Sequence, residues 1–188
     1  MANFKMGSQT VFTQTDDNTP VLDNSVKYTA GEIVQLCYSG EMTGLFHFDT
    51  AAYEHCTQLD VTITPKFANS LIWYQGWAKT IMNNTSSQMG QDYQIRRVVS
   101  ADTSKNSTIA GASWQNYFNN TDFSADSYQP WNISRFDTPN TTHPITYQMW
   151  GRIYNGTAAS WQIGDTNMNA GAAGESSRGN TWVTEIKQ

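Results

Sequence analysis

The sequence predicts an all-β fold, an antiparallel β-sandwich of the jelly-roll kind, and three observations support this. Aromatic residues make up 13% of the 188-residue chain, and their side chains fit the surface of a pleated sheet. No window of a dozen residues keeps the apolar stripe of an amphipathic helix. Short alternating segments recur at intervals of roughly 10–20 residues, separated by clusters of Asn, Ser, Thr, Gly and Pro. This pattern is typical of a single sandwich or barrel domain with a short appendage.

The appendage is the N-terminal segment, residues 1–30, which we expect to be extended. It holds one short alternating stretch at residues 10–14, between turn signals at Asp16-Asp17-Asn18 and Pro20. Its scattered apolar residues are too few to bury a core, so they should pack on the body, on another subunit or on a larger particle. They are the candidate attachment residues Phe4, Val11, Phe12, Val21 and Leu22.

The body, residues 31–188, contains ten predicted strands. One short helical turn is possible at residues 50–55, and residues 171–174 form a predicted flexible loop before the last strand. The predicted strands are residues 32–38, 45–48, 58–64, 70–82, 93–100, 108–117, 131–136, 145–154, 158–163 and 181–187.

The strand at residues 145–154 has the clearest alternation in the chain. Period two places neighbouring side chains on opposite faces of the sheet. We expect the face of Ile145, Tyr147, Met149 and Ile153 to fill the core, which leaves Trp150 and Tyr154 on the other face.

Seven Trp residues exceed the needs of one small core. In the predicted strand at residues 70–82, Trp73 and Trp77 share one face, while Ile72, Tyr74 and Ala78 take the other. A strand with bulky groups on both faces is covered on both sides, here by the core and by a neighbouring subunit. The candidate subunit interface is therefore Trp73, Trp77, Trp150, Tyr154 and Trp182.

A rival interpretation treats the aromatic residues as a platform for sugar rings. Under it, the residues at the loop end of the sandwich would contact a receptor or glycan. These are Trp114, Tyr117, Phe118, Phe123, Tyr128 and Trp131.

Charge and hydropathy argue against nucleic-acid and membrane partners. The net charge is −5 with only 11 Lys and Arg residues, so the basic footprint of a nucleic-acid binder is missing. No apolar run approaches the roughly 20 residues of a membrane helix. The first ten residues, MANFKMGSQT, lack the apolar core of a signal peptide, so we expect synthesis in a host cytoplasm.

Catalytic and cofactor motifs are also missing, and we expect neither an enzyme nor a bound cofactor or metal. His47, His55 and Cys56 match no metal-ligand spacing. The carboxylate pairs Asp122/Asp126 and Glu41/Asp49 are no more than chance provides among 16 acidic residues. The two cysteines, Cys37 and Cys56, form no disulfide framework, so we expect free thiols in the core.

Four segments, in this order, resemble those of one protein family. They are VTITPKFANSLIWYQGWAKTI, DYQIRRVVSADTS, SRFDTPNTTHPITYQMWGRIYNGTAASWQIGD and GNTWVTEIKQ, and the resemblance covers about residues 31–188. The family consists of virion structural proteins of tailed phages, especially aquatic and marine ones. Its body is a jelly roll similar to the tumour necrosis factor and complement globular-head folds, and usually forms a trimer. Two departures from the family are Trp182 in the last strand and the long aromatic stretch at residues 115–129.

The resemblance implies a homotrimer located in the virion, with the major capsid protein or other virion proteins as partners. Head decoration, in which residues 1–30 grip the capsid lattice, is favoured because the sequence carries no shaft repeats. The alternative is the tip or adaptor of a tail fibre with a host receptor or glycan as its partner. The resemblance carries no catalytic residues.

Overall fold

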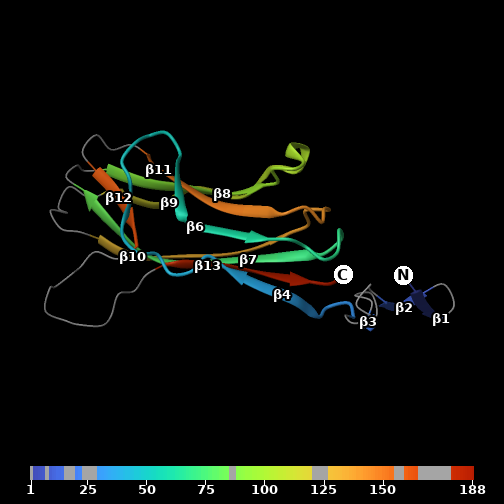
Figure 1. Ribbon diagram of the computed structural model, residues 1–188. Helices are drawn as coiled ribbons and strands as arrows, with labels where there is room; N and C mark the ends of the chain where they lie inside the picture. Colours follow the sequence, from blue (N-terminus) through green and yellow to red (C-terminus); the bar gives the residue numbers. More distant parts are fainter. Residues whose placement is uncertain are drawn as a thin grey trace, which may run out of the picture.

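The computed structural model describes residues 2–6, 9–14, 20–22, 29–84, 88–119, 127–154, 159–164 and 179–188. Within these residues the fold is almost entirely β, with two antiparallel sheets stacked face to face (Figure 1). The strands of the body are β4 (Ile33–Tyr38), β5 (Phe46–Phe48), β6 (Glu54–Ile63), β7 (Leu71–Asn84), β8 (Gln88–Val98), β9 (Ser107–Asn119), β10 (Ser127–Asp137), β11 (Ile145–Tyr154), β12 (Ala159–Ile163) and β13 (Asn180–Ile186).

The long strand β7 organises one sheet, which we call the β7 sheet. One edge of β7 pairs with β10, and the other pairs first with β13 and then with β12. Strand β4 extends the sheet beyond β13, and β5 extends it beyond β12.

The second sheet, which we call the β11 sheet, has the strand order β6-β11-β8-β9. Without the short strands β5 and β12, eight body strands remain, and their order in the two sheets follows from the pairings. The β7 sheet has the order β4-β13-β7-β10, which are the first, eighth, third and sixth of these eight strands. The β11 sheet has the order β6-β11-β8-β9, which are the second, seventh, fourth and fifth. This is the strand order of a jelly roll.

The core lies between the two sheets, and strand β11 supplies much of it. The predicted core face is confirmed, because Ile145, Tyr147, Met149 and Ile153 are all buried. From the β7 sheet, the Tyr74 ring meets the Tyr147 ring at a centroid distance of 5.7 Å. Ile72 and Ala78 are buried beside Tyr74, as the alternation of β7 predicts.

Two polar networks inside the body join the segments that resemble the phage family. In the first, Asp137 at the end of β10 accepts from Arg97 Nη1 at 2.6 Å and from the Tyr147 hydroxyl at 2.7 Å. This network ties β8, β10 and β11 together. Burial, reinforced by Asp137, raises the pKa of Tyr147 well above its ordinary value.

In the second network, the buried Glu185 carboxylate of β13 holds the loop between β6 and β7. Its Oε1 accepts from the Ser70 hydroxyl at 2.5 Å and from the backbone N–H groups of Lys66 and Phe67 at 2.8 and 3.2 Å. Its Oε2 accepts from Gln35 Nε2 at 2.6 Å. Arg97, Asp137 and Glu185 therefore stabilise the fold, and this structural role accounts for their presence in the motifs.

All ten predicted body strands are present, with ends that shift by a few residues. The helical turn expected at residues 50–55 is wrong. The chain bends at Thr50–Ala52 and enters β6 at Glu54, where His55 and Cys56 already pair with β11. The loop expected at residues 171–174 lies outside the described residues.

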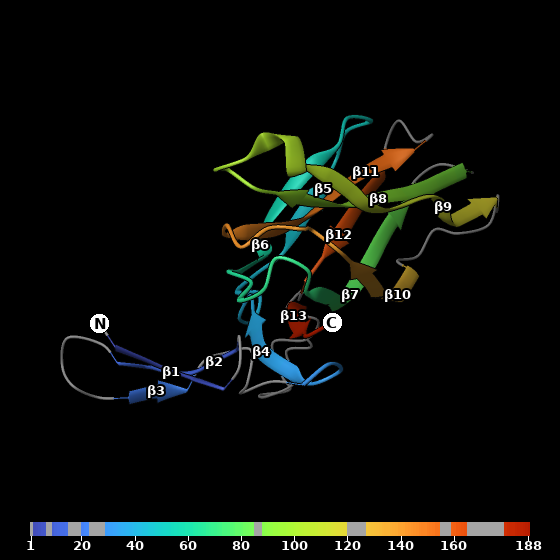
Figure 2. The ribbon, with the colours of Figure 1, turned by 90° about the vertical axis from the view of Figure 1, so that its right-hand side faces the viewer.

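The N-terminal segment is more ordered than expected. It forms a small sheet of its own from β1 (Ala2–Met6), β2 (Gln9–Gln14) and β3 (Pro20–Leu22), in that order. Figures 1 and 2 show this N-terminal sheet beyond the start of β4, away from the stacked sheets.

Both cysteines are free thiols, as predicted. Cys56 is completely buried in the core, and this burial raises the pKa of its thiol to about 12. Cys37 is partly buried and packs against the core.

Candidate assembly face

The outer face of the β7 sheet is the most apolar surface that the structure describes. Among the described residues, the large hydrophobic side chains that are strongly exposed number four, and all of them lie on this face. They are Ile33 (64% exposed), Leu36 (61%), Tyr38 (70%) and Phe136 (59%). Soluble monomers rarely leave such groups together in water, so their clustering indicates a surface that another molecule covers.

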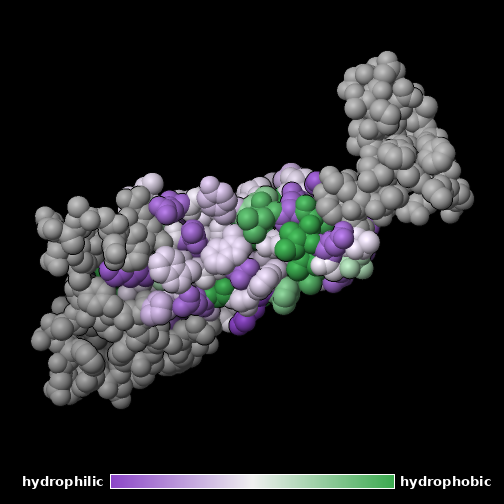
Figure 3. Space-filling model, turned by 90° about the horizontal axis from the view of Figure 1, so that it is seen from below, coloured by the Kyte–Doolittle hydropathy of each residue, from purple (hydrophilic) through white to green (hydrophobic). Residues whose placement is uncertain are grey.

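Strand register explains why these residues meet. On the outer face, Leu36 of β4 lies beside Thr184 of β13, Thr184 beside Trp73 of β7, and Trp73 beside Phe136 of β10. The Trp73 and Phe136 rings stack at a centroid distance of 5.6 Å. We call the apolar residues of this face the apolar strip, which consists of Ile33, Leu36, Tyr38, Trp73, Phe136 and Ile186. Within the strip, Ile33 pairs with Ile186 at one end, and Tyr38 pairs with Trp182 at the other. Figure 3 shows hydrophobic side chains gathered toward one end of the face.

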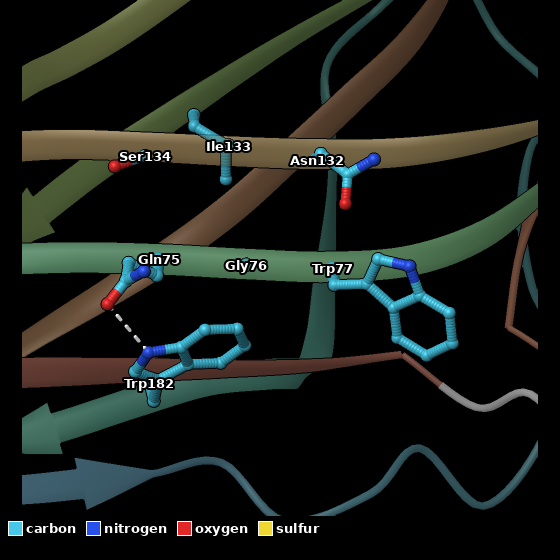
Figure 4. Close-up of a pocket in the computed structure, with 7 residues that line it drawn as sticks. All are labelled: Gln75, Gly76, Trp77, Asn132, Ile133, Ser134 and Trp182. Carbon is cyan, nitrogen blue, oxygen red and sulfur yellow. Dashed lines mark hydrogen bonds between the residues drawn. The ribbon is translucent and has the colours of Figure 1, made fainter.

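The other end of the same face carries an open hollow with aromatic and neutral polar walls. Its volume is about 460 Å³. Figure 4 shows the Trp77 and Trp182 indoles on neighbouring strands β7 and β13, with Gln75 beside Trp182. Trp182 Nε1 donates to Gln75 Oε1 at 2.8 Å, which fixes the orientation of that indole. The hollow is lined by Gln75, Gly76, Trp77, Asn132, Ile133, Ser134 and Trp182.

The outer face of the β11 sheet is different, because its own side chains stack on one another. The His55 imidazole stacks on the Trp150 indole at a centroid distance of 4.8 Å, and the Arg96 guanidinium lies 4.1 Å from the Trp150 ring. His55 also bonds to Asp60 at 2.7 Å. Burial raises the pKa of Asp60, opposed by its bond to His55.

A second polar group lies on the same face around Asp92. Its carboxylate accepts from the Tyr53 hydroxyl at 2.5 Å and pairs with Arg152 Nη2 at 2.6 Å. The Arg152 guanidinium also lies over the Tyr53 ring at 4.5 Å. Burial and then the bond to Asp92 raise the pKa of Tyr53. Among the described side chains, the outer face of the β11 sheet thus forms contacts of its own around Trp150 and Asp92, whereas the β7 sheet leaves large apolar groups exposed.

The structure brings together three of the five residues predicted to form a subunit interface. Trp73, Trp77 and Trp182 share the outer face of the β7 sheet. Trp150 lies instead on the outer face of the β11 sheet, next to His55 and Arg96, and so does not share a surface with the other three. The side chain of Tyr154 lies outside the described part of the chain.

Trp131, predicted at a receptor-binding loop, is buried in the core with 5% exposure. Its ring fills the space that Gly76 leaves empty, since a Cβ on Gly76 would lie 2.6 Å from the Trp131 ring. It is therefore unavailable to a receptor in this structure. The other predicted receptor residues, Trp114, Tyr117, Phe118, Phe123 and Tyr128, have side chains outside the described part of the chain.

Three of the five candidate attachment residues occupy one cross-strand row of the N-terminal sheet. Phe4 of β1 pairs with Phe12 of β2, and Phe12 pairs with Leu22 of β3. Val21 pairs with Thr13 in the next row, and Val11 lies at the bulge between β1 and β2. Their side chains are outside the described part of the chain.

The weak candidates for metal binding and catalysis do not converge. His47 is exposed, His55 bonds to Asp60, and Cys56 faces the core. Glu41 and Asp49 are both exposed, and Asp122 and Asp126 are outside the described residues. Within the described ranges, no three His, Cys, Asp or Glu side chains group in a way that could hold a metal ion. Those ranges also contain no helix long and apolar enough to cross a membrane.

Sequence reasoning missed the contribution of β4 and of Phe136 to the assembly face. A signal was present in β4, because apolar residues at Val34, Leu36, Cys37 and Tyr38 occupy both faces of the strand. The pairing of β4 with β13, which places Leu36 and Tyr38 beside the Trp residues, could not be read from alternation alone.

No family model matches this chain, and no curated protein matches it either. Several solved structures of infectious bursal disease virus are similar in part. The VP2 subviral particle gives a TM-score of 0.43 at 12% identity, covering 90% of this chain and 36% of that one. The T13 viral particle gives 0.37 at 12% identity, and the Gx strain gives 0.36 at 10%, each covering 92% of this chain. The chain thus spans 36–40% of the length of these viral chains.

Proposed function

We propose that this protein is a homotrimeric structural component of a tailed-phage virion that decorates the head. The observation that carries the proposal is the apolar strip, which holds every strongly exposed large hydrophobic side chain of the described residues. Structural proteins that assemble permanently bury such faces against copies of themselves.

A homotrimer accounts for the contrast between the two outer faces. Among the described side chains of the β11 sheet, Trp150 and Asp92 on the outer face already have partners within the subunit. The β7 sheet exposes Leu36 and Phe136, which would turn toward the threefold axis. Burial of about 1,000 Å² of such surface per subunit would contribute up to roughly 25 kcal/mol before the costs of association.

The placement in a phage virion rests on the four segments that resemble the phage family. Two of their polar pairs, Arg97 with Asp137 and Ser70 with Glu185, meet inside the body. These motif residues thus hold this fold together, and the role on the head comes from the resemblance.

The N-terminal sheet is the proposed attachment to the capsid lattice. Phe4, Phe12 and Leu22 occupy one cross-strand row of this sheet. Removal of residues 1–28 should leave a folded trimer, because it keeps Thr29, whose N–H donates to Glu32 at 2.7 Å, and Gly31, whose N–H donates to the Lys187 carbonyl at 2.7 Å. The truncated protein should no longer join particles.

The decisive experiment locates the protein on virions. Particles should be labelled with an antibody against the body and imaged at low resolution, with the truncated protein supplied in place of the full chain as a control. Head decoration predicts label over the capsid shell that disappears with the truncated protein. Label confined to the tail would favour the fibre-tip alternative, and normal incorporation of the truncated protein would refute the attachment role of residues 1–28.

A further inference from the structure

We propose that the hollow between Trp77 and Trp182 is a binding site for a neutral sugar residue of a glycan. This site is separate from the loop-end residues that the sequence suggested. It also goes beyond the structural role proposed above, because a decoration protein needs no ligand to be assembled.

The size and the aromatic walls of the hollow suit a small ligand. Its volume of about 460 Å³ falls within the range of roughly 300–1,000 Å³ typical of small-ligand pockets. Trp77 and Trp182 are both only half-buried, so part of each indole stays open to solvent. The C–H face of a pyranose ring packs well against such a flat, electron-rich surface.

Hydrogen bonds already hold the walls of the hollow in place before a ligand binds. The bond from Trp182 Nε1 to Gln75 Oε1 holds one indole in place at 2.8 Å. On the neighbouring strand pair, Trp73 Nε1 donates to the Ser134 hydroxyl at 2.8 Å and fixes that wall of the hollow. A ligand would therefore find its stacking surface and one polar group already ordered, which lowers the cost of binding.

Among the described residues, the hollow offers no charged side chain to a ligand. All seven lining residues are neutral, so an acidic or basic ligand would lose its hydration without gaining a counter-charge. Three polar groups can still meet sugar hydroxyls: the Gln75 Nε2 amide, the Ser134 hydroxyl hydrogen and the exposed Asn132 amide. Neutral hydroxyl groups are the chemistry that this set recognises.

The hollow and the far end of the apolar strip are separated along β13. Along β13, Trp182 lies four residues from Ile186 of the apolar strip, about 13 Å at the usual rise of a strand. Tyr38 of the apolar strip pairs with Trp182 and so borders the hollow, whereas Ile33 pairs with Ile186 at the far end of the strip. A subunit centred on Ile33, Leu36 and Ile186 therefore leaves the hollow open.

The test measures glycan binding by the intact full-length protein. A printed array of neutral and acidic bacterial surface glycans identifies binders, and ligand-observed NMR titration with chitotriose and maltotriose gives the per-site affinity of neutral sugars. Neutral glycans should bind, and Trp77→Ala should weaken the affinity at least tenfold. Asn132→Ala, at an exposed position that should tolerate truncation, should weaken it several-fold.

Phe136→Ala is the matched control, because it removes an exposed aromatic ring of the same face outside the hollow. It should weaken the trimer and leave the per-site sugar affinity unchanged, whereas Trp77→Ala should keep the trimer. The proposal is overturned if the wild-type protein binds no neutral glycan, if only acidic glycans bind, or if the Trp77→Ala and Asn132→Ala proteins bind like the wild type. Dissociation of the trimer by Trp77→Ala would assign the hollow to the subunit contact instead, which also overturns it.

Discussion

Glu185 shows how much of this fold depends on single polar residues. Its carboxylate is fully buried and accepts hydrogen bonds from Ser70, Gln35 and two backbone N–H groups of the β6–β7 loop. A buried charge is tolerated when both carboxylate oxygens accept hydrogen bonds, as they do here. The last strand and the loop are therefore coupled through one side chain.

Glu185→Gln should reduce the free energy of unfolding by about 2–4 kcal/mol. The reason is that the side-chain amide nitrogen of Gln is a donor, and it would face an N–H or O–H group that donates a hydrogen bond to the carboxylate of Glu185. Urea unfolding followed by fluorescence measures this. Glu41→Gln is the control, since Glu41 is exposed, and it should change stability by less than about 0.5 kcal/mol. Equal stability of the Glu185→Gln protein and the wild type would contradict the role assigned to the carboxylate.

Cys56 predicts a loss of stability in alkali. Burial raises the pKa of the Cys56 thiol to about 12 in the folded protein, whereas in the unfolded chain the thiol has its ordinary pKa of 9.0. Between these values the native state binds more protons, so the free energy of unfolding falls as pH rises. From pH 9 to 10.5 this contributes a loss of about 2 kcal/mol.

Urea unfolding at several pH values should show this slope, and Cys56→Ala should make it shallower. Buried tyrosines such as Tyr74 and Tyr147 have raised pKa values as well, so part of the slope remains in the variant. An identical slope in the two proteins would show that the Cys56 thiol does not carry the effect.

At the level of elements, alternation predicted strands well and their partners poorly. The two faces of β11 and β7 followed directly from period two, because inward and outward environments differ sharply in a sandwich. Trp150 and Trp73 both point outward, yet they lie on opposite sheets. The sheet to which each strand belongs depends on long-range strand pairing, which alternation does not predict. Trp131 is buried because Gly76, on the neighbouring strand, leaves room for its ring.

Glycines inside the strands offer a direct test of packing in the core. A Cβ on Gly151 of β11 would lie 2.4 Å from the Trp161 ring and 2.7 Å from the Phe48 ring, so Gly151→Ala must displace two buried aromatics. We expect a loss of about 1–3 kcal/mol in thermal or urea unfolding. Gly111→Ala in β9 is the matched control, because the nearest atom would be 3.7 Å away, and it should be neutral or slightly stabilising. A cost for Gly111→Ala as large as that for Gly151→Ala would contradict this packing.

In the part of the molecule that the structure describes, the outer face of the β7 sheet exposes large apolar side chains, and that of the β11 sheet does not. Composition predicted surplus aromatic residues and an interface, but it could not say which sheet would carry it. That answer needed the pairing of β4 with β13, which adds Ile33, Leu36 and Tyr38 to the Trp residues of β7 and β13. The N-terminal sheet was hidden for a similar reason, since its strands are short and pair only with one another in the sheet order.

The assembly state of the purified protein tests this account most directly. Light scattering coupled to size exclusion should give a mass of about 63 kDa, three times the 21.1 kDa of the chain. Leu36→Glu, which places a charge in the apolar strip, should lower the mass toward one subunit. Thr62→Glu, on the exposed outer face of the β11 sheet, should leave the mass near 63 kDa. A wild-type mass near 21.1 kDa at all concentrations, or dissociation by Thr62→Glu instead of Leu36→Glu, would contradict the assignment of the β7 sheet as the trimer face.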